Sequence, residues 1–128
     1  MSRFEPYAYA ILRIVSGLLF IVHGSSKLLK FPAQMASSMP HPMPPIVLAS
    51  GIIELVAGLL IAIGLFTSYA AFIASGEMAV AYFMAHWQLG KASFWPAVNH
   101  GEPAVLYCFI FLYLFAHGSG IWSVKKDR

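Results

Sequence analysis

Apolar residues fill four stretches of this 128-residue chain, and each stretch is long enough to cross a lipid bilayer. About 20 residues of apolar helix span the roughly 30 Å hydrocarbon core of a bilayer. The stretches predict helices over about residues 7–29, 46–66, 69–89 and 103–121. Because backbone polar groups cannot stay unpaired in lipid, we expect an all-α fold, an integral membrane four-helix antiparallel bundle.

The composition excludes an ordinary soluble enzyme. The chain is 59% hydrophobic and 10% charged, whereas a typical soluble domain is roughly 25% charged. A cleaved signal peptide is a poor interpretation of the first stretch, because the apolar run extends to about Leu29 and its basic N-terminal region is Arg3 offset by Glu5. We therefore expect residues 1–128 to form a single membrane domain.

Prolines and one short turn separate the predicted helices. Phe31-Pro32 ends the first helix, and a loop rich in proline and methionine, with four prolines between residues 40 and 45, delays the second. Thr67-Ser68 alone separates the second helix from the third, so these two must pack antiparallel. A second loop over residues 90–101 precedes the fourth helix, which Glu102-Pro103 opens.

Charged residues interrupt the apolar stretches. A charge at the centre of a membrane helix costs roughly 2.5–3.5 kcal/mol on insertion scales, so such side chains normally face a partner or a cavity. On the second helix Glu54 shares a face with Gly58 and Ala62, whose spacing favours the close approach of another helix. The charged residues within the stretches, which predict a polar interior, are Arg13, Lys27, Glu54 and Glu77.

Helical periodicity and depth gather the ionisable residues into the half of the membrane next to the two long loops. Arg13 lies nearer the opposite face, and we expect its long side chain to reach Glu77 or Glu54. Glu77 and His86 are nine residues apart and point in opposite directions on a regular helix, so we assign the interior to Glu77. The predicted intramembrane polar pocket consists of Arg13, His23, Lys27, Glu54, Glu77, His86 and Glu102.

The residue types of this pocket favour proton transfer coupled to a quinone. Imidazole titrates near neutral pH, so His23, Glu54 and His86 could relay protons. The aromatic residues expected to line the site and stack on a quinone ring are Trp87, Trp95 and Tyr107. A haem held by two histidines, or a metal held by histidine and carboxylate, is a weaker alternative, because no CxxCH or HExxH motif is present. No residue is assigned a catalytic role.

The residues of all four stretches resemble the DoxX family of small membrane proteins. The resemblance rests on Arg13-Ile14, Gly17, Phe20, His23-Gly24, Lys27-Leu28, Glu54-Leu55, Gly58, Gly64-Leu65-Phe66-Thr67, Ala81, His86, Asn99 and Gly101-Glu102. Ser68 stands where arginine is common in the family, and His100 where a small residue is frequent. The resemblance implies a four-helix membrane protein, with members linked to quinone-dependent oxidation of sulfur compounds and to membrane complexes that resist oxidative stress.

Our leading hypothesis is a quinone-linked oxidoreductase subunit. The alternative is a non-enzymatic membrane scaffold or assembly factor, in which the same charges lock the helices together and the loop from Met35 to Met43 docks a partner. The methionines of that loop also suggest a site for a soft metal such as Cu(I), because methionine sulfur is a soft ligand. A position of these methionines at the membrane surface is the better explanation. A small transporter is a weaker hypothesis, because one four-helix unit leaves little room for alternating access.

The expected partners follow from the same features. They are the lipid bilayer, a soluble or membrane redox partner subunit and, as an open alternative, a second copy of the chain. The lone Cys108 excludes a CxxC redox pair, so another subunit would deliver any electrons. Nucleic acid is not expected, because the net charge of +3 comes largely from the tail of Lys125, Lys126 and Arg128. This tail favours cytoplasmic termini in the inner membrane of a bacterium or archaeon.

Overall fold

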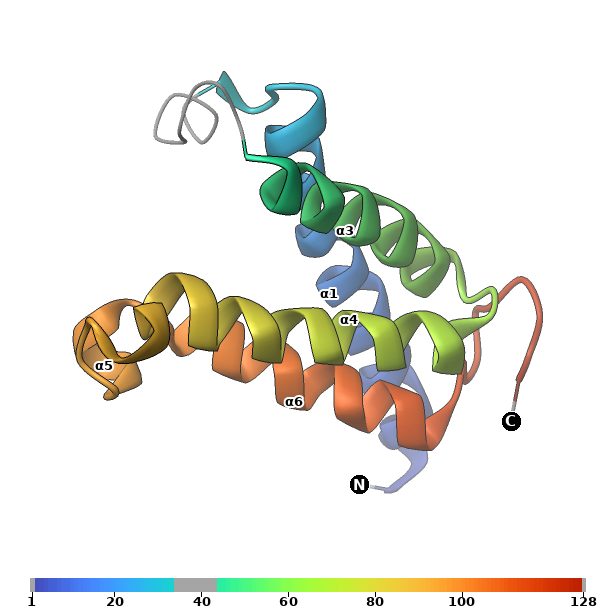
Figure 1. Ribbon diagram of the computed structural model, residues 1–128. Helices are drawn as coiled ribbons and strands as arrows, with labels where there is room; N and C mark the ends of the chain where they lie inside the picture. The colour runs from blue at the N-terminus through green and yellow to red at the C-terminus, as the bar shows by residue number, and fades with distance from the viewer. Residues whose placement is uncertain (1, 34–43, 128) are drawn as a thin grey trace.

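The structure is a computed structural model that describes residues 2–33 and 44–127, so the predicted role of the Met35 to Met43 loop lies outside the described residues. Every regular element in these two ranges is helical (Figure 1). The elements are η1 (Ser2–Phe4), α1 (Glu5–Leu28), α3 (Pro45–Ile63), α4 (Thr67–Ala81), the π-helical turn η2 (Tyr82–His86), η3 (Gln88–Gly90), α5 (Pro96–Asn99) and α6 (Glu102–His117).

Proline lies at the start of three of these helices, as the sequence predicts, whereas the glycines that end two of them were not predicted. The predicted break at Thr67-Ser68 is wrong, because α3 ends at Ile63 and α4 begins at Thr67, so residues 64–66 form the turn. A proline occupies the first turn of α1, α3 and α6, where its missing N–H costs nothing. Gly64, in the left-handed conformation with φ of 76°, ends α3 and donates its N–H to Leu60 and Ile61. Gly118, with φ of 95°, ends α6. The fourth helix is therefore shorter than predicted, and residues 118–127 turn back along the molecule.

The helices differ in how well they match the thickness of a membrane. In the described part of the chain, the helical runs Ser2–Leu28 and Pro45–Ile63 are long and apolar enough to cross a bilayer. The third predicted helix divides into α4 and the π-helical turn η2, which together make 20 residues. The shorter α6 is also apolar, with 16 residues.

Glycines bring α1 and α3 into direct backbone contact. A Cβ atom at Gly17 would lie 2.6 Å from the Ala62 nitrogen, and one at Gly24 would lie 2.5 Å from the Leu55 nitrogen. A Cβ atom at Gly58 would likewise lie 2.8 Å from the Gly17 carbonyl oxygen. The two helices are therefore antiparallel, and the close approach predicted from Gly58 and Ala62 is confirmed.

Hydroxyl groups and rings join α4 to α6. Ser75 Oγ donates to the Cys108 carbonyl at 2.8 Å, and Ser68 Oγ donates to the Phe115 carbonyl at 3.1 Å. The Phe72 and Phe115 rings pack with their centroids 5.2 Å apart. The later residue of α4, Ser75, contacts the earlier residue of α6, Cys108, so this pair of helices is antiparallel as well.

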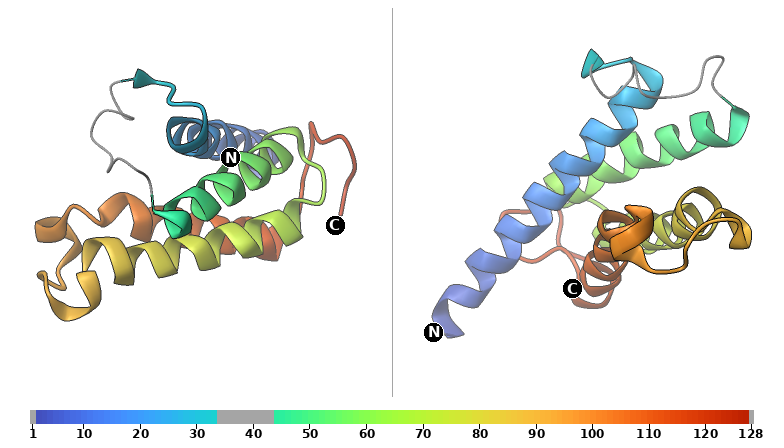
Figure 2. Two further views of the ribbon diagram at one scale, coloured as in Figure 1. Left: turned by 45° about the horizontal axis from the view of Figure 1, so that its top comes forward. Right: turned by 90° about the vertical axis from the view of Figure 1, so that its left-hand side faces the viewer.

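The two helix pairs meet at one end of the molecule and diverge toward the other (Figure 1). The turn at residues 64–66 joins α3 to α4 where the pairs converge, and the C-terminal segment lies at the same end (Figure 2). Between the pairs the buried core includes Phe20 from α1, Ile61 from α3, and Phe111 and Leu114 from α6. The divergence leaves the start of α3 separated from the end of α4 (Figure 1).

Candidate functional site

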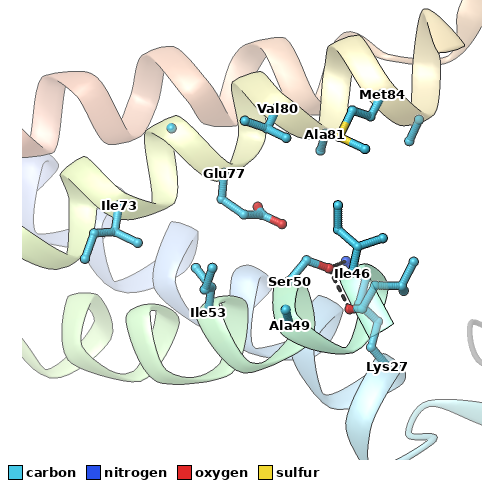
Figure 3. Close-up of a pocket in the computed structure, with 13 residues that line it drawn as sticks. Lys27, Ile46, Ala49, Ser50, Ile53, Ile73, Glu77, Val80, Ala81 and Met84 are labelled. Carbon is cyan, nitrogen blue, oxygen red and sulfur yellow. Dashed lines mark hydrogen bonds between the residues drawn. The ribbon is translucent and has the colours of Figure 1, made fainter. Parts of the chain in front are cut away.

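A groove lies between α3 and α4 where the helix pairs diverge (Figure 3). Its volume is about 470 Å³, and most of its lining is aliphatic. The polar residues of its wall are Lys27, Ser50 and Glu77. The aliphatic and small residues are Ile46, Val47, Ala49, Ile53, Ile73, Gly76, Val80, Ala81, Met84 and Ala85.

An ion pair between α1 and α3 forms the polar end of this groove. Lys27 Nζ lies 2.8 Å from both carboxylate oxygens of Glu54, and it donates to Ser50 Oγ at 3.0 Å. Ser50 Oγ in turn donates to the Val47 carbonyl at 2.7 Å. Glu54 is 2% exposed, so its charge depends on Lys27 for compensation.

The ion pair can form because a glycine lets the two helices touch beside it. A Cβ atom at Gly51 would lie 2.9 Å from the Lys27 Cβ, so any larger residue at this position would push the lysine away. Ser50 and Glu54 stand four residues apart on α3 and therefore share one face of the helix. That spacing could have identified Ser50 as a site residue, which the sequence prediction missed.

Glu77 faces the ion pair from the other side of the groove. Its side chain extends from α4 toward α3 in Figure 3, and it lies within hydrogen-bonding reach of the Glu54 side chain. Glu77 Oε2 and Glu54 Oε1 are buried and accept no hydrogen bond from the described part of the chain, so the contact of Glu54 Oε1 with Lys27 Nζ at 2.8 Å is an ion pair without a hydrogen bond. Two carboxylates face one ammonium, so the cluster is electrically neutral when the two carboxyl groups share a proton.

His23 and Tyr107 lie beside this cluster but do not line the groove. The His23 ring packs edge-on against the Tyr107 ring at 6.0 Å and is within electrostatic range of Glu54 and Lys27. Tyr107 lines a smaller groove of about 300 Å³ between α1 and α6. Its ring also stacks on Phe111 at 5.7 Å.

Arg13 lies at the converging end of the molecule, away from the groove, and its contacts differ from our expectation. Its Nε donates to the Ile61 carbonyl at 3.1 Å. Its Nη1 donates to the Ser119 carbonyl and to the Ile121 carbonyl, the latter at 2.8 Å, and its Nη2 donates to the Trp122 carbonyl at 2.7 Å. Among the described residues no carboxylate pairs with this guanidinium, so the expected contact with Glu77 or Glu54 is absent. Backbone carbonyls satisfy it instead.

The remaining predicted site residues gather around α5, beyond the groove. His86 Nδ1 lies 3.4 Å from the Asn99 carbonyl oxygen, and Trp87 packs edge-on against Phe94 at 5.5 Å. Trp95 is 69% exposed. Glu102 is exposed in the first turn of α6. The predicted pocket is thus divided, and the structure brings together Lys27, Glu54 and Glu77, with His23 adjacent.

The C-terminal segment contains a carboxylate that the sequence prediction missed. Asp127 accepts hydrogen bonds from the backbone N–H of Ser119 and of Ser68, each at 2.7 Å. Partial burial favours a raised pKa for Asp127, but these N–H donors outweigh it and hold the pKa below its ordinary value. Asp127 thereby links the start of α4 to the end of α6.

A metal centre has no candidate in the part of the chain that the structure describes. Across residues 2–33 and 44–127, no three side chains of His, Cys, Asp or Glu come together as ligands. The two histidines considered for a haem have different neighbours: His23 packs against Tyr107, and His86 lies against Asn99.

The fold and the site define a helical protein with apolar helices of membrane length and an ion cluster around the buried Glu54. A family model, DoxX, matches residues 8–87, so the chain belongs to the DoxX family and is a membrane protein. An uncharacterized protein of Haemophilus influenzae is 45% identical over 127 residues, which cover 98% of this chain and 94% of the relative. No solved structure matches the chain.

Proposed function

We propose that this protein binds a membrane quinone in the groove between α3 and α4 and serves as the membrane subunit of an oxidoreductase. The observation that carries the proposal is the combination of aliphatic groove walls with a polar cluster in which Lys27 and Glu77, both partly buried, line the groove beside the buried Glu54. Pockets for small molecules are typically apolar, with a few polar groups that orient the ligand.

The groove residues fit the two parts of such a molecule. Ile53, Ile73 and Val80 offer aliphatic contacts for an isoprenoid tail. Lys27 and Glu77 line the groove, so these two side chains can hydrogen-bond to the polar head. A bound quinone would supply electron and proton transfer, whereas the protein would bind, orient and exchange protons. We assign delivery of electrons to a partner subunit, because the chain has no CxxC pair.

The proposed placement in the bilayer has four crossings, by α1, α3, α4 with its π-helical turn, and α6. Large apolar side chains are exposed along these helices, as expected where lipid covers them; examples are Ile11, Val15, Leu18, Ile52, Val56, Leu59, Phe72, Leu106 and Phe109. We propose that both termini lie on the cytoplasmic side of the inner membrane. In support, the Tyr7 and Trp122 rings pack 5.6 Å apart, and the basic residues Arg3, Lys125 and Lys126 are nearby in sequence.

Blocking the groove tests the proposal directly. The wild-type protein, purified in mild detergent from its native membranes, should release a quinone at near-stoichiometric amount on organic extraction and mass spectrometry. Ala49→Trp places an indole in the groove from an exposed lining position of α3, and it should remove most of that quinone. The matched control, Val56→Trp, changes an exposed residue of α3 outside the groove and should retain it.

Two results would sink the quinone proposal. One is a wild-type protein that carries no quinone and binds none when a soluble analogue is added. The other is equal retention of quinone in Ala49→Trp and Val56→Trp. A thermal unfolding curve for each variant separates loss of ligand from loss of fold.

A second candidate function is a membrane scaffold, and the position of Gly76 favours it. Gly76 lines the groove on α4, and a Cβ atom added there would have no neighbour within 4 Å. Small residues on membrane helices allow a partner helix to pack closely. For a scaffold, the purified protein should lack quinone and carry a stoichiometric partner subunit. Gly76→Leu should then displace that partner.

A further inference from the structure

The connection from α4 to α6 exposes large apolar side chains at the far end of that helix pair (Figure 1). This connection, residues 87–101, contains η3 and α5. Leu89 is 70% exposed, Trp95 69% and Val98 64%, and Phe94 is exposed as well. Single exposed apolar residues are ordinary on a protein surface, but several large ones in so short a segment mark a surface that contacts another molecule.

Polar side chains hold this connection together from within. The Asn99 amide donates to the Ser93 carbonyl at 2.8 Å and to the Tyr82 hydroxyl at 3.1 Å. Tyr82, on η2, in turn donates to the Phe94 carbonyl. A Cβ atom at Gly101 would lie 2.7 Å from the Tyr82 ring, so glycine is needed for this packing. The connection is thus a folded element with polar groups turned inward, and the exposure of its apolar side chains is part of that fold.

A row of aromatic rings joins these exposed side chains to the proposed lipid-facing surface of the third crossing. Phe83, which is exposed on η2, packs edge-on against Trp87 with ring centroids 5.9 Å apart. Trp87 packs in the same way against Phe94 at 5.5 Å, and Phe94 against Trp95 at 6.3 Å. The exposed surface of the connection is therefore continuous with a surface that we place in lipid, and this continuity favours lipid over a protein as its partner.

The chemistry of the connection fits the interfacial layer of a bilayer. Tryptophan is enriched in that layer, because its ring is apolar and its N–H can reach polar headgroups. Lys91 is the only lysine, arginine, aspartate or glutamate in residues 87–101, and it is exposed. A lysine stem can lie along acyl chains while its ammonium reaches lipid phosphate. With no carboxylate in the connection, no side chain there repels the phosphate groups.

From this arrangement we infer that residues 87–98 form an anchor in the interfacial layer of the bilayer, with Leu89, Trp95 and Val98 among the upper parts of the acyl chains and Lys91 at the phosphate groups. The anchor follows directly on η2, so it also fixes the depth of α4 and of the groove wall that α4 forms. This inference does not depend on which ligand the groove binds. It gives Trp87 and Trp95 a role in the membrane in place of the stacking on a quinone that we expected.

The fluorescence of Trp95 tests the position of this anchor. Trp87→Phe combined with Trp122→Phe leaves Trp95 as the only tryptophan of the chain. The purified protein is reconstituted into vesicles of phosphatidylcholine and phosphatidylglycerol whose acyl chains carry bromine near the headgroup or near the chain end. Trp95 should lose most of its fluorescence to the shallow bromines, less to the deep bromines and little to iodide in the water.

A tryptophan in the middle of α6 serves as the matched control. Phe109→Trp, with phenylalanine at the three native tryptophan positions, replaces an exposed ring of α6 and should be quenched most by the deep bromines. If that control is quenched by lipid while Trp95 is quenched by iodide alone, the anchor is overturned and the crossing by α6 stands. This result would leave the exposed surface to a protein partner. Stronger quenching of Trp95 by the deep bromines would also overturn the interfacial position.

Photolabelling of the wild-type protein gives an answer that does not require any variant to fold. A phosphatidylcholine with a diazirine beside its headgroup is added to the same vesicles and activated by light, and the labelled peptides are identified by mass spectrometry. Lipid adducts should be found within residues 87–98. Adducts elsewhere on the protein, with none in this segment, would contradict the anchor.

Discussion

Each end of this molecule holds a cation, Arg13 fully buried and Lys27 partly buried, but the two cations have different kinds of partner. At the converging end, four backbone carbonyls surround Arg13, and three of them belong to the C-terminal segment. At the diverging end, side chains surround Lys27, and a second carboxyl group, Glu77, faces the pair.

The difference indicates which end is available for chemistry. Carbonyls cannot change their charge or leave, so the contacts of Arg13 can hold chain segments together and do little else. Carboxyl groups can exchange protons and change partners, and the cluster of Lys27, Glu54 and Glu77 borders a groove. Mutations should therefore affect the two ends differently.

The largest expected effect is the loss of Arg13. Arg13→Ala removes a fully buried side chain that donates to Ile61 and to three residues of the C-terminal segment. We expect the free energy of unfolding to fall by about 4 kcal/mol, because buried carbonyls lose their donors and a cavity remains. Thermal unfolding in detergent, followed by circular dichroism, measures the change.

Arg13→Lys is the informative control for that experiment. Lysine keeps the charge but lacks the planar guanidinium fork, so it should restore part of the stability and not all of it. A melting temperature for Arg13→Ala within a few degrees of the wild type would contradict the structural role that we assign to this end.

The next effect in size concerns Lys27, and here the loss can be reversed. Lys27→Met leaves the buried Glu54 carboxylate beside Glu77 with no cation, and it should lower the free energy of unfolding by about 3 kcal/mol. Lys27→Met combined with Glu54→Met should return to within about 1 kcal/mol of the wild type, because both charges are then absent. The double-mutant cycle is measured by thermal unfolding.

No second mutation can rescue Arg13 in the same way, since its acceptors are backbone atoms. The two ends therefore differ in whether a second mutation can restore the lost stability. If the double variant were no more stable than Lys27→Met alone, the two side chains would not act as a pair, and the difference between the ends would be lost.

The sequence predicts much of the diverging end, because its residues interact through side chains at helical spacing. Prolines correctly mark the starts of α1, α3 and α6, and Gly58 with Ala62 correctly marks a close helix contact, although the sequence does not identify α1 as the partner. Depth places Lys27 and Glu54 toward the side of the two long loops, and helix face assigns Glu77 to the interior. Periodicity assigns the interior to Glu77 and not to His86; in the structure Glu77 lines the groove, and His86 lies against Asn99.

The converging end was not predictable by the same reasoning. The partners of Arg13 are backbone carbonyls, which every residue carries, so side-chain type gives no signal for them. The fold-back of residues 118–127 depends on Gly118 and Gly120 at positive φ, and a glycine in a sequence does not specify its direction of turn. The divergence of the helix pairs likewise depends on packing between residues distant in sequence.

The third effect in size is that of adding a methyl group to a glycine, either in the close interface of α1 with α3 or in the open groove. Gly24→Ala would place a Cβ 2.5 Å from the Leu55 nitrogen, so α1 and α3 must separate, at a cost of about 2 kcal/mol. Gly76→Ala meets no atom within 4 Å and should stabilise the protein by about 0.5 kcal/mol, because alanine favours the helix. Thermal unfolding measures both changes in stability. If the two substitutions both lowered or both raised the melting temperature, this distinction between interface and groove would be wrong.

The smallest effect is that of Asp127, which adds a pH-dependent contact to the converging end. The pKa of Asp127 is lower in the folded protein than in the unfolded chain, so its charged form stabilises the fold at neutral pH. This stability is complete above the ordinary aspartate pKa of about 3.9 and is lost as the pH falls below it, through the folded pKa.

Asp127→Asn should therefore cost about 1 kcal/mol at neutral pH, because the N–H donors of Ser68 and Ser119 lose a charged acceptor. The cost should shrink as the pH is lowered below the ordinary aspartate pKa, where the wild-type carboxyl group is also neutral. Melting curves of both proteins over that pH range measure the difference. A cost that stays constant with pH would mean that the shape of the C-terminal segment, and not the charge of Asp127, holds the start of α4.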